Sequence, residues 1–274
     1  MEILRYRAFT TDDETSGNPA GVVLDAEELD EAAMLAIAAD LGFSETAFLT
    51  AISPDAAHVR YFTPRAEIAF CGHATIASGV ALARLRDAGP VVTLTTNVGP
   101  VPVEVTTERA TLVAPGTTVE DLTDARLDDV LRVLRLDRAD LDPALPPALV
   151  HGGNLHPLVV VRPGVLASLD HDGDAMLALQ DAHGWDGTVP VVERLDAVRF
   201  ASRNPFPRGG IREDPATGSA AAGLGAYLRA GGHVDAPTTI TVSQGKETGH
   251  PSRLRVDIPT EGRIRVTGTG APLA

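Results

Sequence analysis

Two segments in which a polar cluster opens onto a long run of small apolar residues constrain the fold of this chain more than any other feature. One starts at Phe70-Cys71-Gly72-His73-Ala74-Thr75 and the other at Glu213-Asp214-Pro215-Ala216-Thr217-Gly218-Ser219-Ala220. A helix with no polar side must be enclosed by other elements. We therefore predict two core helices, over Ala74 to Leu85 and over Ala216 to Arg229. Their N-terminal N–H groups and polar clusters can meet at one ligand.

The chain also carries the marks of an internal duplication. Three short anchors recur in the same order, at offsets of 136, 139 and 142 residues. They are Gly17-Asn18 with Gly153-Asn154, Val59-Arg60 before Phe62 with Val198-Arg199-Phe200, and Ala74-Thr75 with Ala216-Thr217. Any one dipeptide recurs by accident, but three in order indicate a duplicated, two-lobed protein.

The mixture of strand and helix patterns favours an α+β fold. Predicted strands outnumber helices, and few strand–helix–strand units lie in register for a parallel doubly wound sheet. Each pseudo-symmetric lobe is therefore expected to be a mixed, barrel-like β-sheet around its central apolar helix. We place the lobes at residues 1–117 and 118–274, with the C-terminal strand packing back on the first lobe. The crossover is expected near the amphipathic helix at Leu127 to Leu134 and the Pro-rich loop from Asp142 to Pro147.

Charge and composition exclude several classes of partner. The net charge is −14 and the basic residues are scattered, which argues against nucleic acid and against anionic membranes. The sequence shows no charged-then-apolar leader and no apolar run near the ~20 residues that a membrane helix needs. A cytoplasmic location is expected.

Signals for metals and cofactors are weak. The single cysteine, Cys71, excludes an internal disulfide and a multi-thiolate metal site. Neither a P-loop nor a well-placed dinucleotide fingerprint appears, and four histidines lack zinc-ligand spacing. These histidines are His151, His156, His171 and His183. We expect no metal and no nucleotide.

Glu45 is the strongest candidate for an acid/base group. The run from Phe43 to Leu49 predicts a strand, in which Glu45 shares a face with Ala47 and Leu49 because side chains alternate. If that face is inward, burial raises the pKa of the carboxyl toward a value useful for proton transfer. The alternative is that Phe48 is on the buried side and Glu45 is a surface charge, and the pattern alone leaves both open.

The polar residues before the first core helix also allow two interpretations. A helix N-terminus would stabilise a Cys71 thiolate, although a lone cysteine beside an aromatic residue is more often packed in a core. His73 can relay protons or bind a substrate oxygen, or it can simply cap the helix. Gly72 lets a ligand approach the backbone. The second half holds no matching cysteine, which argues against a two-thiol racemase.

The cluster before the second core helix is denser than capping requires. Asp214 before Pro215 is typical of a helix start, and a nearby Ser or Thr can act as a cap. A loop rich in Gly and Arg that leads to a helix N-terminus also suits a bound carboxylate. The residues concerned are Arg208, Gly209, Gly210, Arg212, Asp214, Thr217 and Ser219.

Together, several stretches resemble the PhzF-like family, which is named for the phenazine-biosynthesis isomerase and shares the diaminopimelate epimerase fold. The matching stretches run in order from near residue 5 to near residue 256. They are Gly17 to Leu24, Ser44 to Phe48, Tyr61 to Pro64, Cys71 to Thr75, Glu213 to Ala220, Gln244-Gly245 and Gly249 to Ser252.

The resemblance implies an active site in the cleft between two lobes, no cofactor, and a homodimer. The residues that it implies are Glu45 for proton transfer, His73 and Asp214 for positioning or proton relay, and Gly72, Gly218 and Ser219 for substrate contacts. The run from Arg65 to Ala69 departs from the acidic, Pro-containing run of closer relatives and is expected to border the cleft. The substrate therefore does not carry over from the family.

The leading hypothesis is a cofactor-independent isomerase that moves a proton on a small carboxylate-bearing substrate, with Glu45 as general acid/base. A second hypothesis is a racemase or epimerase that uses Cys71, with Glu45 or Asp214 as the opposing base. A third is a non-catalytic dimer that binds a small molecule in the same cleft.

Overall fold

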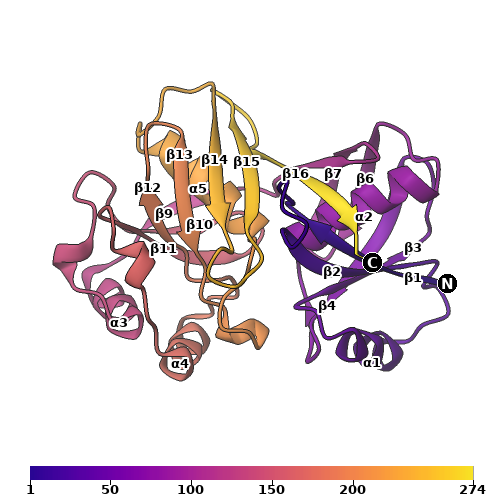
Figure 1. Ribbon diagram of the computed structural model, residues 1–274, viewed down its shortest axis with the longest axis horizontal. Helices are drawn as coiled ribbons and strands as arrows, with labels where there is room; N and C mark the ends of the chain where they lie inside the picture. The colour runs from indigo at the N-terminus through magenta and orange to yellow at the C-terminus, as the bar shows by residue number, and fades with distance from the viewer. Residues whose placement is uncertain (274) are drawn as a thin grey trace.

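The chain folds around two apolar helices, each wrapped by its own set of strands (Figure 1). The computed structural model describes residues 1–273. The indigo and purple part of the chain forms one body in Figure 1, and the pink to orange part forms the other. The yellow C-terminal strand lies in the first body. The predicted α+β fold, with two lobes built on barrel-like sheets, is confirmed.

The first lobe is a closed, mixed barrel of eight strands within residues 1–273. Its strands are β1 (Glu2–Ala8), β2 (Asn18–Leu24), β3 (Thr46–Thr50), β4 (Ala56–Phe62), β6 (Val91–Thr96), β7 (Gly99–Val105), β8 (Arg109–Val113) and β16 (Arg265–Pro272). They pair in that order, and β16 closes the ring because it pairs with both β8 and β1. The short strand β5 (Glu67–Ile68) pairs with β4.

Helix α2 (Gly72–Leu85) lies inside this barrel and contacts β1, β2, β7, β8 and β16. Its residues are buried from the first turn through Leu82, as its lack of a polar side predicts. Helix α1 (Glu31–Leu41) covers the outside of the same lobe. The side chain of Asp30 caps its N-terminus, and Gly42 ends it in the left-handed conformation.

The second lobe repeats this order of strands around helix α5 (Gly218–Ala230). Its strands are β9 (Thr118–Asp121), β10 (Ala148–His151), β11 (Leu155–Val161), β12 (Val191–Arg194), β13 (Arg199–Arg203), β14 (Thr238–Gln244) and β15 (Ser252–Ile258). Its other helices are α3 (Asp124–Leu134), α4 (Gly173–His183) and the single turns η1 (Arg138–Asp140), η2 (Leu166–Ser168) and η3 (Pro207–Gly209).

The strand pairing shows the duplication directly. The pairs β2–β3 and β4–β6 are parallel in the first lobe, and β11–β12 and β13–β14 are parallel at the matching places in the second. Helices α1 and α4 lie in the first of these crossovers, and α2 and α5 in the second. The repeat therefore presents the N-termini of α2 and α5 from corresponding places in the two lobes.

One of the three sequence anchors is out of register. The core helices begin at Gly72 and Gly218, whereas Ala74 lies inside α2 and Ala216 precedes α5. The true counterpart of Cys71, the N-cap residue of α2, is thus Thr217, the N-cap residue of α5.

The region predicted to hold the crossover belongs to the second lobe instead. Helix α3 packs against α4 there, in an apolar cluster with Trp185, because its apolar stripe needs a partner within its own lobe. The chain passes between lobes between β8 and β9, and again between β15 and β16. Among residues 1–273, β9 pairs with β10 and with no other strand, so the strands of the second lobe do not close into a ring. At their other end, β15 pairs with β16 and joins the strands of the two lobes into one continuous sheet. The division at residues 117 and 118 remains a prediction.

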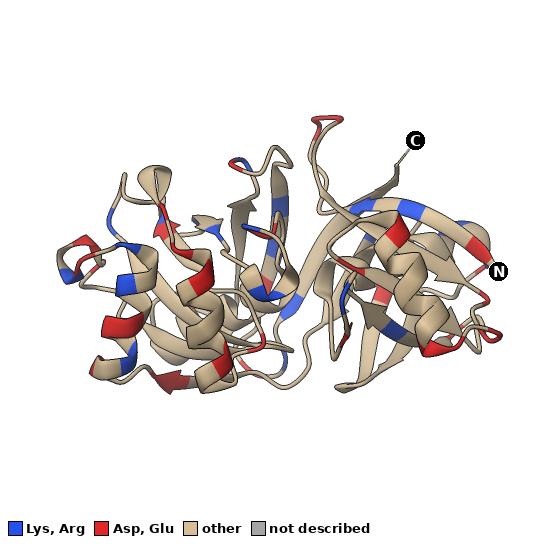
Figure 2. Ribbon diagram, turned by 90° about the horizontal axis from the view of Figure 1, so that it is seen from below, with Lys and Arg blue, Asp and Glu red and all other residues tan. Residues whose placement is uncertain are grey.

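The surface agrees with the even spread of charge in the sequence. Acidic and basic segments are interspersed over both lobes in Figure 2. Within residues 1–273, none of the helices combines the length and the apolar character needed to cross a bilayer.

Candidate active site

A cavity of about 320 Å³ lies between the lobes, where the N-termini of α2 and α5 meet. The first lobe lines it with Glu45, Thr63 and residues 65–73, and the second lobe lines it with the segment from Ala216 to Ser219 and with the loops beside β11 and β13. The expectation that the run from Arg65 to Ala69 borders the cleft is confirmed, because all five of its residues line this cavity.

The two helix N-termini touch through glycine. A Cβ atom built on Gly72 would lie 2.9 Å from the Cα atom of Gly218, closer than real Cβ contacts allow. Only glycine at these positions lets the two helices approach. The first N–H groups of a helix have no acceptor within the helix, so this junction presents donors from both lobes to an anion in the cavity. The predicted contact residues Gly72, Gly218 and Ser219 all line it.

Glu45 lies immediately before strand β3 and not within it, because β3 begins at Thr46. The alternation argument fails here because β3 is buried on both faces, with Ala47 and Leu49 in the core around α2 and Phe48 in the cluster under α1. Glu45 itself is only 4% exposed and faces the cavity. The reading of Glu45 as a surface charge is therefore wrong.

The carboxyl group of Glu45 is held in its neutral form by its surroundings. Burial, and then the charge of Asp214, raise the pKa of Glu45 to about 8, against a hydrogen bond from Ser44 that lowers it. Its Oε2 atom is buried and has no hydrogen-bond partner among residues 1–273. An acid with this pKa exchanges protons readily near neutral pH.

His73 lies beside Glu45 as a neutral imidazole. Burial lowers the pKa of His73 to about 3, so the 3.4 Å contact between its Nε2 atom and Oε2 of Glu45 is not an ion pair. Its Nδ1 atom lies 3.3 Å from the sulfur of Cys71. The imidazole can accept or donate one hydrogen bond toward a ligand without adding charge.

Asp214 is fixed by hydrogen bonds from both lobes. Asn18 of β2 donates to its Oδ1 atom at 2.6 Å, and the hydroxyl of Thr217 donates to Oδ2 at 2.6 Å. Gln244 of β14 donates to its backbone carbonyl at 2.7 Å. Burial raises the pKa of Asp214 to about 6, partly offset by the bonds from Thr217 and Asn18. Of the Glu45 and Asp214 carboxyls, Glu45 thus keeps its proton to the higher pH.

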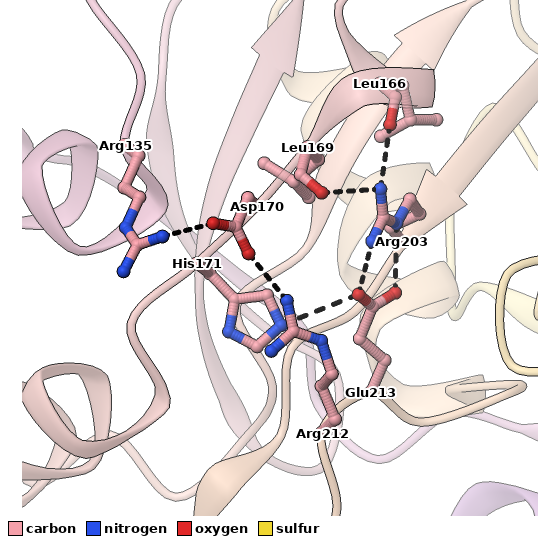
Figure 3. Close-up of polar contacts among 8 residues, drawn as sticks. All are labelled: Arg135, Leu166, Leu169, Asp170, His171, Arg203, Arg212 and Glu213. Carbon is pink, nitrogen blue, oxygen red and sulfur yellow. Dashed lines mark hydrogen bonds and ion pairs between the residues drawn. The ribbon is translucent and has the colours of Figure 1, made fainter.

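The neighbouring carboxylate, Glu213, has a structural role (Figure 3). Arg203 donates to its two oxygens at 3.0 and 2.5 Å and also to the carbonyls of Leu166 and Leu169. Burial opposes ionisation, but contacts with His171 and Arg203 outweigh it and lower the pKa of Glu213 to about 2. Figure 3 also shows Arg212 directed at Asp170. Of the predicted Gly/Arg loop, Arg208 lines the cavity and Arg212 does not.

Ser219 connects the cavity to a polar relay that sequence reasoning missed. Its hydroxyl lies 3.0 Å from Nε2 of His156, and Nδ1 of His156 lies 3.1 Å from the carbonyl oxygen of Thr188. A carbonyl only accepts, so Nδ1 carries the proton and Ser219 donates to Nε2. Burial lowers the pKa of His156 to about 4. In the sequence, the Gly153-Asn154 anchor just before His156 is the signal that points to this part of the site.

Cys71 is a buried thiol. Burial, and then the charge of Glu45 when it is ionised, raise the pKa of Cys71 well above its ordinary value. Of the two interpretations that the sequence allows, the structure favours the packed thiol over the thiolate. Its sulfur, a nitrogen of His73 and a carboxyl oxygen of Glu45 lie within 4.8 Å of one another, a set of donor types that can hold a metal ion. The absence of a metal and of any cofactor remains a prediction.

Comparisons with known proteins place this geometry in context. A family model described as phenazine biosynthesis-like protein (PhzC-PhzF) matches residues 6–274. An uncharacterized isomerase of Mesorhizobium japonicum is 33% identical, with 94% of this chain and 91% of that protein covered. The trans-2,3-dihydro-3-hydroxyanthranilate isomerase of Pseudomonas chlororaphis is 30% identical, with 93% and 91% covered.

A solved structure shows the same architecture. The PhzF-family phenazine biosynthesis protein of Bacillus anthracis superimposes with a TM-score of 0.85 at 26% identity, over 100% of this chain and 98% of that one.

Proposed function

The chain belongs to the phenazine biosynthesis-like (PhzC-PhzF) family and is an isomerase, and from that premise we propose that it moves a proton between carbons of a small carboxylate-bearing substrate, with Glu45 as general acid/base and no cofactor. The observation that carries the proposal is the buried Glu45 carboxyl. Its Oε2 atom is unpartnered among residues 1–273, and it faces a cavity at the junction of two helix N-termini.

The reaction follows from the placement of the groups. The N–H donors at Gly72, Gly218 and Ser219 bind the substrate carboxylate and stabilise negative charge that develops next to it. Ionised Glu45 takes a proton from a carbon, so that a C–H bond breaks and an O–H bond forms. The electron pair shifts through an adjacent double bond, and Glu45 returns the proton to the carbon at its far end. No electrons leave the substrate, as an isomerisation requires.

His73 and Asp214 have supporting parts in this proposal. His73 stays neutral and lies beside Glu45. It can therefore share a hydrogen bond with the Glu45 carboxyl without forming an ion pair with it. The charge of Asp214 raises the pKa of Glu45, which makes Glu45 a stronger base when it is ionised. Asp214 also lines the cavity.

Solvent-deuterium exchange tests the assignment of Glu45. The first compound to try is trans-2,3-dihydro-3-hydroxyanthranilate, since a relative is named for acting on it. Because the Glu45 carboxyl can exchange its proton with water before it delivers one, we expect product formed in D₂O to carry deuterium at the new carbon. Glu45→Gln should slow both turnover and exchange by roughly 10²–10⁴-fold. Glu120→Gln, an exposed carboxylate on β9, serves as the control and should behave as wild type. Unchanged exchange in Glu45→Gln would remove Glu45 from the mechanism.

The other two hypotheses have less support. A racemase based on Cys71 needs a thiolate, whereas the pKa of Cys71 is raised, and the counterpart Thr217 offers no second thiol. A non-catalytic binding protein does not call for a buried carboxyl with a raised pKa inside the cavity. The predicted homodimer remains a proposal that follows from the family resemblance, and the cytoplasmic location remains a proposal as well.

A further inference from the structure

Two arginines, one from each lobe, line the outer part of the cavity. Arg65 lies in the turn between β4 and β5, and Arg208 lies in η3. Both are exposed, whereas Glu45, Asp214 and Ser219 are buried. The cavity therefore has carboxyl groups and helix N-termini at its buried end and guanidinium groups at its open end.

The Arg65 guanidinium has no ion-pair partner in the part of the chain that the structure describes. The Arg65 side chain makes no salt bridge and no hydrogen bond with any residue in 1–273, and only its backbone N–H is bonded, to Thr63. The nearest acidic neighbour in sequence, Glu67, is taken by Arg60 at 2.7 Å and by Asn97 at 3.0 Å. Arg65 is thus free to pair with a ligand.

The ion pair that Arg208 makes within the protein is exposed and weak. Arg208 pairs with Asp181 of α4, and the side chains are 34% and 61% exposed. Exposed ion pairs contribute little to stability because water and salt screen them. A ligand anion held at the cavity can therefore exchange for Asp181.

The guanidinium group of Arg65 lies against the chain segment that carries Arg208. The guanidinium carbon of Arg65 lies 3.5 Å from the place that a Cβ of Gly210 would occupy. Gly210 ends η3, two residues after Arg208, with a φ of 78° that favours glycine. Arg65 of the first lobe thus reaches the second lobe at the segment that carries Arg208.

Apolar side chains line part of the cavity. Ile68, Phe70 and Phe206 line it together with Ala66 and Ala69. A ligand that fills the cavity therefore meets N–H donors at the helix starts, apolar side chains, and the two arginines.

We propose that the substrate carries a second anionic group, separated from the reacting carboxylate by an apolar spacer and bound by Arg65 with help from Arg208. The inference rests on the proposed function for the first carboxylate, and it adds the substrate class: small dianionic acids. Arginine pairs with such groups through two parallel hydrogen bonds, which select for the anion by geometry as well as by charge.

Calorimetric binding of matched acids tests this. The probes are the α,ω-dicarboxylates from malonate to adipate, each compared with the monocarboxylate of the same carbon count. We expect one dicarboxylate to bind wild type at least about tenfold more tightly than its monocarboxylate partner, since a charge-assisted bond contributes roughly 1.5–3 kcal/mol. The advantage should fall below about twofold in Arg65→Gln, shrink in Arg208→Gln, and weaken as salt rises.

Controls separate this inference from the proposed function. Arg65→Lys should keep part of the advantage, and Arg212→Gln should keep all of it, because Arg212 is directed at Asp170 outside the cavity. The series is repeated in Glu45→Gln, where binding should persist although proton transfer is lost. Equal binding of mono- and dicarboxylates, an advantage that survives in Arg65→Gln, or no binding of either kind would each overturn the proposal, whatever the exchange experiment shows.

Discussion

The two lobes share one plan yet bring different chemistry to the cavity. At corresponding helix starts the first lobe has Cys71-Gly72-His73 and the second has Thr217-Gly218-Ser219. The glycine is common to both, because the helices touch there. The flanking residues differ: Cys71 and His73 are neutral groups beside Glu45, whereas Thr217 and Ser219 are tied to Asp214 and His156. The duplication provides the backbone donors at both helix starts, and divergence provides different side chains beside them.

This asymmetry bears on the reaction. A racemase that works on both faces of one carbon needs two matched acid/base groups on opposite sides. Here Glu45 and Asp214 are both titratable carboxyls that line the cavity. Asn18 and Thr217 donate to the two oxygens of Asp214, whereas Oε2 of Glu45 has no hydrogen-bond partner among the described residues. The two carboxyls are therefore not a matched pair, which fits the proposal that Glu45 alone transfers the proton.

The largest difference between the lobes is expected in how a carboxyl of each one makes the free energy of unfolding depend on pH. Glu45 of the first lobe has a pKa raised to about 8 from 4.5, and Glu213 of the second has a pKa lowered to about 2. The contribution of Glu45 to the free energy of unfolding is fully present below about pH 4.5 and is lost as pH rises through about 8. For Glu213 it is present above about pH 4.5 and is lost as pH falls through about 2.

Urea unfolding at pH 5 and pH 9 measures the first of these effects. The unfolding free energy of wild type should fall between these values by on the order of 3 kcal/mol. Glu45→Gln should remove most of the fall, leaving the smaller part that comes from Asp214. Glu213→Gln should instead lower stability at both pH values, because it leaves Arg203 buried without its partner. A wild-type curve that is flat over this range would contradict the raised pKa of Glu45.

A second, somewhat smaller effect is expected at the shared glycine. Gly72→Ala places a Cβ at 2.9 Å from the Cα of Gly218, so the helices must separate. We expect a loss of about 1–3 kcal/mol in unfolding free energy and weaker binding of carboxylates. Gly116→Ala is the matched control, since a Cβ there would meet no atom within 4 Å. Wild-type stability in Gly72→Ala would show that the helix junction is looser than described.

These positions also show how far sequence reasoning reaches. The buried helices and the duplication follow from patterns that the chain displays locally, small apolar runs and repeated dipeptides. The contact between Gly72 and Gly218 joins residues far apart in the chain, and nothing in either segment specifies the other. The same is true of His156, which pairs with Ser219 across the second lobe. For Glu45 the strand argument fails, since β3 is buried on both faces, and the resemblance of the stretch from Ser44 to Phe48 to the PhzF-like family is the remaining sequence signal.

A smaller effect tests the relay in the second lobe. His156→Phe removes the acceptor for the Ser219 hydroxyl and frees that hydroxyl to rotate. We expect kcat to fall about tenfold, in line with the loss of one buried hydrogen bond, with the pH profile of Glu45 unchanged. Ser219→Ala should produce a similar loss, and the double variant should lose little more, because both changes break one interaction. Losses that simply add would show that the two residues act independently.

The smallest effect is expected where the lobes differ most in residue type. Cys71→Ser should change turnover less than about twofold, because the thiol is neutral and its sulfur contacts the imidazole of His73 only weakly. Thr217→Val at the matching position should cost clearly more, since it removes a 2.6 Å bond to Asp214, and Thr217→Ser should restore activity by restoring the hydroxyl. Alkylating reagents should leave wild type active, as a buried thiol with a raised pKa reacts slowly. Rapid inactivation that Cys71→Ser abolishes would make Cys71 part of the chemistry, and would bring the two helix starts closer to the matched pair of a racemase.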